Sequence, residues 1–361
     1  ERLTEGLLNS PPAPTADEIG SESGSAMAGG KEKVWGEWVP HGHLSRKNLV
    51  NAFLTLAACA PSILYVAYLR EDCDSDADDL SACGLYARRP NLLLHLLFFF
   101  NVSVGFWVVG LLQRSFWLID PYWTLFPPMA GAFYATRRAA APGSAQLAAM
   151  LALVLAWSLR LTHSYFRREG WKFGEREDWR YTDMAKKHPR HWWWMSFFAV
   201  GFAQQFMLCP LVYPFYSVSV AAEAKADSGG SWGSLASWGA LDSVAAAMAT
   251  LGLAISAIAD RQLYAYCNLD RKAKPPVLDR GLWHFSRHPN YVGEQIWWWS
   301  FALFAVARGD WLAMAGPFIN SLVLAHVTEL TEQHMLSTWT SKARVAEYKR
   351  YAKRTPKWLL C

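Results

Sequence analysis

The chain has 361 residues, of which 52% are hydrophobic and 15% aromatic, and it carries a formal net charge of +5. Its mean hydropathy is only +0.04 because strongly apolar stretches alternate with polar, basic segments. This pattern excludes a uniformly mixed soluble globule and favours a protein that crosses a membrane several times. The small positive charge gives no reason to expect a nucleic-acid partner. It suits a basic cytoplasmic face near anionic lipid or an anionic cofactor.

Residues 1–47 are rich in Pro, Ser, Gly and Glu and contain no long apolar run. We predict a disordered cytoplasmic extension, because such a composition cannot bury a hydrophobic core. The chain does not begin with Met, so the sequence leaves open whether a targeting piece has been removed. Residues 48–361 are expected to form one transmembrane domain, in which residues 48–112 supply the first two helices.

A helix needs about 20 mainly apolar residues to cross the hydrocarbon core, and its backbone groups must pair with one another there. Eight stretches approach this requirement, which predicts an all-α polytopic bundle of seven or eight transmembrane helices. These stretches are Asn48–Leu69, Asn91–Leu112, Trp117–Ala135, Leu147–Phe166, Trp193–Val220, Leu241–Leu263, Tyr291–Ala307 and Trp311–Glu329.

Lys and Arg residues concentrate in the segments Arg167–His191 and Arg261–Arg287 and in the C-terminal tail. The positive-inside rule therefore places these segments, together with the N-terminus, in the cytoplasm. The acidic loop EDCDSDADDLSAC then faces the lumen, where Cys73 and Cys83 can form a disulfide. The six cysteines show no metal-ligand spacing, so we predict no metal site.

An ionisable side chain within a span costs roughly 2.5–3.5 kcal/mol on insertion scales, so each one is a candidate for function. Asp120 precedes Pro121 and suits a helix N-cap, and Asp242 suits a cap as well. The long side chain of Arg160 either reaches the cytoplasmic surface or has a functional partner. Asp260 ends an apolar helix at the cytoplasmic side, and exposure of that helix end to water explains its carboxylate as simply as a functional role does.

The stretch HFSRHPNYVGEQIWWWSF, residues 284–301, places polar groups directly before a run of tryptophans. Ser286 or His288 can cap a helix in which Pro289 occupies the first turn. Asn290 then projects from a helix N-terminus, whose free N–H groups and dipole favour an anion. The side chains of Arg280, Arg287 and His288 add donors, so the segment predicts a phosphate site.

Glu294 follows Asn290 by four residues and lies on the same helix face, one turn deeper. Gly293 opens space beside it for a close approach. An anion site at the surface with a carboxylate below it indicates a long ligand whose far end inserts between the helices.

The stretch RGLWHFSRHPNYVGEQIWWWSF, with AIADRQL before it and EYKRYAKRTPKWLL after it, resembles the steroid 5-alpha-reductase C-terminal superfamily. Its DUF1295 branch also fits SFWLIDPYWTLFP and WSLRLTHSYFRREGWKFGEREDWRYTDM, so the resemblance spans roughly residues 100–358 and makes residues 113–361 a DUF1295-like core. The resemblance implies a membrane reductase, in the endoplasmic reticulum, that transfers hydride from NADPH to an activated carbon–carbon double bond. A steroid, a sterol or a fatty enone would be the lipophilic substrate.

The resemblance also implies roles for individual residues. The expected NADPH-binding residues are Asp260, Arg280, Arg287, His288, Asn290, Tyr291, Glu294, Glu332, His334, Tyr348 and Tyr351. Hydride addition to an enone builds negative charge on its oxygen, so a proton donor or cation is needed there. The candidates for this catalytic role are Asp120, Tyr122, Arg160, Tyr165 and Glu294.

Two other interpretations stay open at this point. The isoprenylcysteine carboxyl methyltransferases share an Arg-His-Pro-x-Tyr-x-Gly turn and bind S-adenosylmethionine, although Glu294 and the Asp260 segment favour the reductase. A structural membrane protein that keeps the fold without turnover is the second alternative. The final span reads LAHVTELTEQHML, without the Ser-Gly that many DUF1295 relatives carry, and this departure leaves the substrate open.

Overall fold

The computed structural model describes residues 35–36, 41–73, 78, 80–136, 144–227, 238–270 and 272–358. Every regular element within these residues is a helix, which confirms the all-α polytopic bundle. The predicted disorder of residues 1–47 falls mostly outside the described part of the chain. The helices are α3 (Arg46–Ala57), α4 (Ala60–Asp72), α5 (Ala82–Arg88), α6 (Pro90–Phe98), η1 (Phe99–Phe106), α7 (Trp107–Gln113), α8 (Ile119–Thr136), α9 (Ala145–Arg168), α10 (Trp179–Lys187), α11 (Trp192–Ser196), η2 (Phe197–Phe202), α12 (Ala203–Asp227), α13 (Ala240–Cys267), α14 (Leu282–Phe285), α15 (Pro289–Val306), η4 (Trp311–Met314), α16 (Ala315–Thr338) and α17 (Lys342–Arg354).

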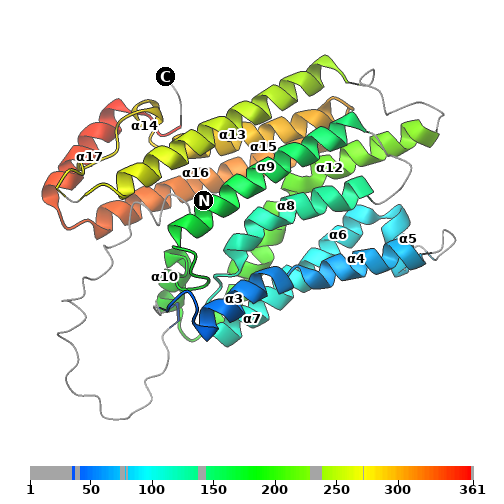
Figure 1. The fold of residues 1–361 in the computed structure, drawn as a ribbon, viewed down its shortest axis with the longest axis horizontal. Coiled ribbons are helices and arrows are strands. Elements are labelled where there is room, and N and C mark those ends of the chain that lie inside the picture. The colour runs from blue at the N-terminus through cyan, green and yellow to red at the C-terminus, as the bar shows by residue number, and fades with distance from the viewer. Residues whose placement is uncertain are drawn as a thin grey trace, which may run out of the picture.

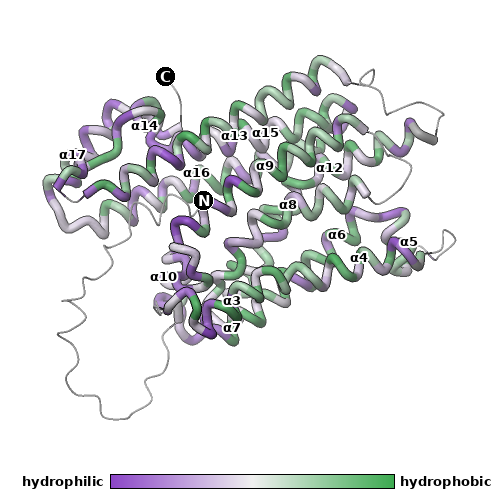
Figure 2. The backbone as a smooth tube through the Cα atoms, in the orientation of Figure 1, coloured by the Kyte–Doolittle hydropathy of each residue, from purple (hydrophilic) through white to green (hydrophobic). Residues whose placement is uncertain are grey.

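The long helices lie side by side in an elongated bundle with two chemically different ends (Figure 1). One end carries α14 and α17, and α10 lies toward the same side; we call this the basic end. The other end carries α5 and the disulfide between Cys73 and Cys83, and we call it the disulfide end. Figure 2 shows hydrophilic residues concentrated in α10 and α17, whereas the long helices are mainly hydrophobic.

Within the described residues, six helical stretches are long and apolar enough to cross a membrane. They are Arg46–Glu71, Pro90–Gln113, Ala145–Arg168, Trp192–Lys225, Ala240–Cys267 and Trp311–Thr338. The two other predicted spans are also helices, α8 and α15, with 18 residues each. These two helices do not meet the length and hydropathy requirement that the six satisfy, and each holds residues poorly suited to lipid: Pro127 and Pro128 in α8, and Glu294 and Gln295 in α15. Both pack extensively against neighbouring helices, α8 against α9 and α15 against α13.

The crossing of α13 and α15 brings two backbones into direct contact. A Cβ atom on Gly293 would lie 2.3 Å from Ser256 Oγ, and one on Gly252 would lie 2.6 Å from the Gly293 carbonyl oxygen. Ser256 Oγ also donates a hydrogen bond of 3.0 Å to the Asn290 carbonyl. Small residues permit such close helix packing inside a membrane, where van der Waals contact drives association. Asp260 follows Ser256 by one turn and Glu294 follows Asn290 by one turn, so this crossing positions both carboxylates.

The second and fourth candidate spans are interrupted by π-helical turns, η1 and η2, that pack against each other. Ser103 Oγ lies 3.3 Å from the Gly201 carbonyl, to which it donates a hydrogen bond. A Cβ atom on Gly201 would lie 2.6 Å from the Ser103 carbonyl oxygen, so only glycine allows this contact.

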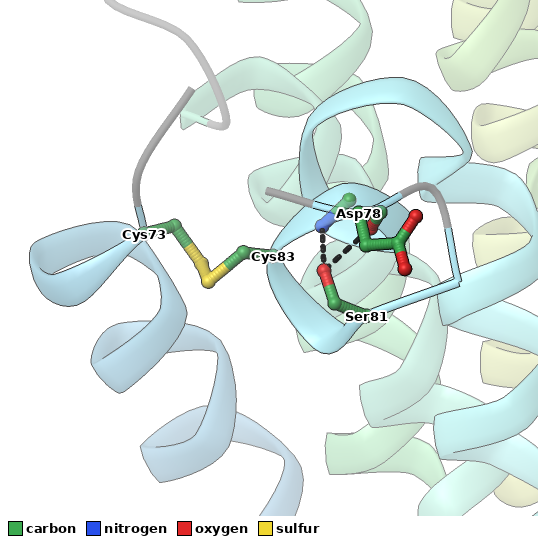
Figure 3. Close-up of a disulfide and its surroundings, with 5 residues drawn as sticks. Cys73, Asp78, Ser81 and Cys83 are labelled. Carbon is green, nitrogen blue, oxygen red and sulfur yellow. Dashed lines mark hydrogen bonds between the residues drawn. A yellow bond between two sulfur atoms is a disulfide. The ribbon is translucent and has the colours of Figure 1, made fainter. Parts of the chain in front are cut away.

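The predicted disulfide between Cys73 and Cys83 is present (Figure 3). Beside it, Ser81 Oγ accepts a hydrogen bond of 3.0 Å from Gly84 N and donates one of 2.6 Å to the Asp78 carbonyl, which caps α5. Disulfides persist in oxidising compartments, so this bond agrees with the orientation expected from the basic residues.

Candidate functional site

Three charged side chains from three helices meet near the basic end of the bundle. Arg160 on α9 donates a hydrogen bond of 2.7 Å to Asp260 on α13, and its second amino group donates to Glu294 on α15. The three residues lie five to eight residues from the basic ends of their helices, or within about 12 Å at 1.5 Å per residue. We call this group the Arg160 triad.

The floor of the Arg160 triad is aromatic. The indole N–H of Trp157 donates a hydrogen bond of 2.8 Å to Glu294. The Trp157 ring stacks on Trp297, with 6.1 Å between ring centroids and 7° between the planes. This arrangement holds the Glu294 carboxylate toward Arg160 and places an apolar layer between the triad and the rest of the span.

The charges of the Arg160 triad do not balance, because two carboxylates face one guanidinium. The side chains are 13% exposed for Arg160, 6% for Asp260 and 16% for Glu294, so the group is largely desolvated and still accessible from one side. Buried polar atoms nearly always have hydrogen-bond partners. Within the described residues, however, Asn290 Oδ1 and Arg160 Nε are buried without a partner. The site therefore retains hydrogen-bonding capacity for a ligand.

A second cluster, which we call the Glu332 brace, holds the turn before α15 in place. His288 Nε2 lies 3.0 Å from one Glu332 oxygen, and Arg287 and Lys357 lie 3.5 Å and 3.6 Å from the other. Tyr348 lines the same small cavity, which has a volume of only about 30 Å³. That space holds one or two water molecules and no nucleotide, because a single water already needs about 10–15 Å³.

The C-terminal segment is tied to the same turn through main-chain contacts. Tyr351 donates a hydrogen bond of 2.5 Å to the Trp283 carbonyl, and Arg287 N donates one of 2.9 Å to the Pro356 carbonyl. Ser286 Oγ donates one of 2.9 Å to the Lys357 carbonyl and accepts one from His288 N. His288 occupies the N-cap position of α15 without a side-chain cap bond, and Ser286 binds only the N–H of His288, so the predicted side-chain cap is made by neither residue.

Burial governs the protonation of the groups in this brace. It lowers the pKa of the His288 imidazole, although the hydrogen bond to the Glu332 carboxylate raises that pKa. Burial raises the pKa of the Tyr348 and Tyr351 phenols, so both stay protonated at neutral pH. A neutral imidazole also stacks on Tyr291, with 5.3 Å between ring centroids.

A larger cavity of about 490 Å³ lies between α8, α9, α10, η2, α12 and α16. Asp120 from the first turn of α8 and Tyr165 near the end of α9 both line it. Leu161 in the cavity wall follows Trp157 beneath the Arg160 triad by four residues, so the two side chains lie on the same face of α9, one turn apart. This cavity, the α10 cavity, therefore neighbours the triad along α9.

The structure thus divides the predicted site residues among several places. Arg160, Asp260 and Glu294 meet in the triad, with Asn290 on the same face of α15 as Glu294. Arg287, His288, Glu332, Tyr348, Tyr351 and Tyr291 belong to the brace. The prediction that Arg287, Asn290 and Glu294 line one ligand site is therefore wrong in detail: the Arg287 side chain contacts Glu332, whereas Glu294 contacts Arg160.

Five predicted residues lie apart from both groups, and two of them, Asp120 and Tyr165, line the α10 cavity. Tyr122 is buried in the aromatic core, 4.9 Å from Phe106 and 5.8 Å from Phe126 between ring centroids. Arg280 is exposed in the turn before α14. His334 stacks on Trp179 of α10 at 3.8 Å, which places it beside the α10 cavity instead of the brace. Asp120 lies within the first turn of α8, because the helix already begins at Ile119.

Four residues of these sites received no catalytic or cofactor-binding role from the sequence: Trp157, Trp179, Gln204 and His326. Gln204 accepts a hydrogen bond of 2.6 Å from Trp123 in the wall of the α10 cavity, and His326 lines it from α16. A polar residue in an apolar span was the available signal for Gln204 and His326. For the two tryptophans there was none, because tryptophan is common throughout the chain.

Comparison with known proteins identifies the family. The family model described as "Protein of unknown function (DUF1295)" matches residues 106–355. An uncharacterized protein of Schizosaccharomyces pombe is 27% identical over 285 residues, which cover 70% of this chain and 77% of the relative. No solved structure matches the chain. The match includes the α8–α9 region, the HPN turn and α17, and the chain therefore belongs to the DUF1295 family, as a membrane protein of the steroid reductase-like superfamily.

Proposed function

We propose that the protein is a membrane reductase that uses NADPH to reduce an activated carbon–carbon double bond in a lipophilic substrate. The observation that carries this proposal is the Arg160 triad, an unbalanced and partly exposed ion cluster with the unpaired Asn290 Oδ1 beside it. Ionisable residues inside a membrane are costly, and one cation between two anions exceeds what helix packing requires.

The donors and acceptors of the triad fit the ribose and nicotinamide end of a dinucleotide. Carboxylates accept hydrogen bonds from ribose hydroxyls, as acidic residues do in other dinucleotide sites. Asn290 Oδ1 can accept an N–H of the nicotinamide amide, and Arg160 Nε can donate to an oxygen. Arg280, exposed beside Gly281 at the basic end, is available for the phosphates.

The α10 cavity supplies a place for the substrate next to the triad. Bound NADPH would supply a hydride at the double bond. The phenol of Tyr165 can then donate to the substrate oxygen, where negative charge develops during reduction of an enone. The Trp157 and Trp297 rings exclude water from the floor of the site, and the Glu332 brace holds the turn from which Asn290 projects.

Equilibrium binding of NADPH to the purified protein tests the cofactor assignment. Asn290→Ala and Glu294→Gln should each weaken NADPH binding about tenfold, or about 1.4 kcal/mol, because each removes one hydrogen-bonding group. Asp242→Asn is the matched control, since Asp242 on α13 also pairs with an arginine, but at the disulfide end. It should leave NADPH affinity unchanged.

S-adenosylmethionine in place of NADPH provides the second arm. Thermal stabilisation by S-adenosylmethionine without stabilisation by NADPH would replace the reductase with a methyltransferase. Failure of both ligands to bind at millimolar concentration would favour a structural protein that keeps the fold.

A further inference from the structure

Another cavity, of about 430 Å³, lies at the basic end where the first two candidate spans reach the membrane surface. The first span begins at Arg46 and the second ends at Gln113, and both residues line the cavity. Residues 174–177, which precede α10, supply a third part of its wall, and α3, α7 and α10 lie close together in Figure 1. The volume is within the range of ligand pockets, which is about 300–1,000 Å³. We call it the α3 cavity, and it shares no lining residue with the α10 cavity.

Basic side chains predominate in the lining of the α3 cavity. Among its described residues, four carry a formal positive charge and two a negative charge: Arg46, Lys47, Arg114 and Arg176 against Glu175 and Glu177. Glu175 also pairs at 3.1 Å with Lys172, which lies outside the lining. The lining therefore has a formal excess of two positive charges, and a lysine from outside compensates part of its acidic share.

The first turn of α3 is charged against the dipole of its own helix. Arg46 and Lys47 are the first two residues of α3, and the first turn holds no acidic residue. A helix N-terminus favours anions, so two cations at this position are unfavourable on their own. An anion bound in the cavity would relieve the repulsion and interact with both side chains.

Arg114 adopts a backbone conformation that is unusual for its type. It follows the last residue of α7 with φ of 54°, in the left-handed region where Gly or Asn is usual. Its carbonyl accepts a hydrogen bond of 3.0 Å from Gly36 N, which helps to hold this conformation. A glycine would suit the backbone better, so the contribution of Arg114 lies in the cation that it adds to the cavity. Backbone strain of this kind is typical of ligand sites.

A chain of hydrogen bonds orders the floor of the α3 cavity. The Trp117 indole N–H donates a bond of 2.7 Å to Gln113 Oε1, and Gln113 Nε2 donates one of 3.3 Å to Asn51 Oδ1. Asn51 Nδ2 in turn donates one of 2.9 Å to the Phe173 carbonyl. Gly174 packs against this chain with φ of 66°, and a Cβ atom there would lie 2.7 Å from Asn51 Nδ2. A ligand thus meets a site that is already ordered.

The lining becomes apolar where it meets the lipid-facing surface of α3. Val50 lines the cavity and is 46% exposed, and Phe53, almost one turn further along α3, is 68% exposed. Leu112, directly before Gln113, is 81% exposed. These side chains form an apolar strip that leads from the cavity into the hydrocarbon region. An acyl chain would lie against this strip, whereas a soluble anion would not use it.

We propose that the α3 cavity binds the headgroup of an anionic phospholipid from the cytoplasmic leaflet. The four cations surround the headgroup phosphate, and the acyl chains lie along Val50 and Phe53. The excess of positive charge matches a headgroup with a net negative charge better than a zwitterionic one. Anionic lipids are concentrated in the cytoplasmic leaflet, and the basic segments place this end of the bundle beside it. The inference is independent of the proposed reductase.

Native mass spectrometry of the full-length protein in detergent measures lipid binding. The probes are phosphatidylserine and phosphatidylcholine with the same acyl chains, which share the phosphate and the tails but differ in net charge. Phosphatidylserine should bind about tenfold more tightly, since several basic residues act on its headgroup. Equal affinity for the two lipids would overturn the proposal.

Variants with fewer cations locate the binding site. Arg46→Gln/Arg176→Gln neutralises two exposed residues of the cavity and should remove the preference for phosphatidylserine. Lys349→Gln/Lys353→Gln is the matched control, because it removes two exposed charges on α17, outside the cavity, and should keep the preference. Arg114→Gly, in which glycine suits the positive φ, should reduce the preference about fivefold. Thermal unfolding checks that each variant is folded. A preference that survives both cavity variants, or that the α17 control also loses, would overturn the proposal.

Competition identifies the source of the anion. Inorganic phosphate and NADPH, each at millimolar concentration, should leave phosphatidylserine bound, because neither has an acyl chain to lie on the apolar strip. Displacement of the lipid by either compound would assign the α3 cavity to a soluble phosphate group and overturn the lipid proposal.

Discussion

An arginine from outside the α13–α15 helix pair meets acidic residues at each end of that pair, but the two arrangements differ in charge balance. At the disulfide end, Arg308 donates hydrogen bonds of 2.8 Å and 3.3 Å to the two oxygens of Asp242. Asp242 also accepts a hydrogen bond of 2.9 Å from Gly239 N at the start of α13. At the basic end, Arg160 faces two carboxylates, Asp260 and Glu294.

The difference separates a structural ion pair from a binding group. The Asp242–Arg308 pair is neutral in sum, and its carboxylate also satisfies the helix N-terminus, so helix packing and capping account for it. The Arg160 triad carries one excess negative charge and lies beside the unpaired Asn290 Oδ1. Two ion clusters in one membrane bundle can thus be told apart by their charge balance and by the number of helices that supply the charges.

The largest loss of stability is expected when the positive charge of Arg160 is removed from the triad. Arg160→Met leaves two facing carboxylates in a largely desolvated site, and we expect a loss of about 3–5 kcal/mol in the free energy of unfolding. Thermal unfolding of the detergent-solubilised protein measures this loss. Arg308→Met should cost less, because Asp242 keeps its bond to Gly239 N. An equal or larger loss at Arg308 would contradict the distinction between the two ends.

The crossing between the two ends is sensitive to a single methyl group. Gly293→Ala places a Cβ atom against Ser256 Oγ and the Gly252 carbonyl, so α15 must move away from α13. We expect a loss of about 1–3 kcal/mol in unfolding free energy from this overpacking, together with weaker NADPH binding. Gly42→Ala is the control, because no atom lies within 4 Å of its added Cβ. Unchanged stability of Gly293→Ala would show that the helices tolerate separation.

The basic end should also respond to pH through His288. Its pKa in the folded protein is lowered from the ordinary 6.5 by burial, so the unfolded chain binds a proton that the folded chain excludes. Stability should therefore be fully present above about pH 6.5 and fall as the pH drops below it, by at most about 1.4 kcal/mol per pH unit.

Unfolding measured between about pH 7.5 and about pH 5.5 checks this direction. His288→Gln should flatten the profile, since the amide keeps a hydrogen bond to Glu332 without titrating. A profile in this variant as steep as that of the native protein would assign the pH dependence to other groups.

The smallest effect is expected at the disulfide end when both partners are replaced. The double variant Asp242→Asn/Arg308→Met leaves no buried charge unpaired, and its unfolding free energy should lie within about 1 kcal/mol of the native value. Asp260→Asn/Arg160→Met should not be restored in this way, because Glu294 stays charged and loses its cation. Double-mutant cycles on both pairs measure this difference.

The helical architecture followed from the sequence because lipid leaves a backbone few alternatives. Apolar runs separated by basic segments predict helices and their orientation, and two cysteines in one acidic loop predicted the disulfide. The π-helical turns η1 and η2 carried no such signal, since their apolar residues fit an α-helix equally well. Their geometry depends on the contact between Ser103 and Gly201.

Among the site residues, the sequence singled out Arg160, Asp260 and Glu294 as costly charges in apolar surroundings. It did not reveal that the three share one ion cluster, because they lie on three different helices. Asp260 and Glu294 follow Arg160 by 100 and 134 positions. It grouped Arg287 with Glu294 on the basis of their short spacing. Arg287 precedes α15 and reaches Glu332, whereas Glu294 lies on α15 and reaches Arg160.

The sequence by itself determined that this chain is a membrane helix bundle with a basic face and a motif of the DUF1295 family, because hydropathy, charge and short motifs are local properties. Only the tertiary structure decided which charges meet, which are braced and where a cavity remains. Those features depend on how the helices are rotated and how closely they cross. At the α13–α15 crossing, Gly252, Ser256 and Gly293 set that closeness.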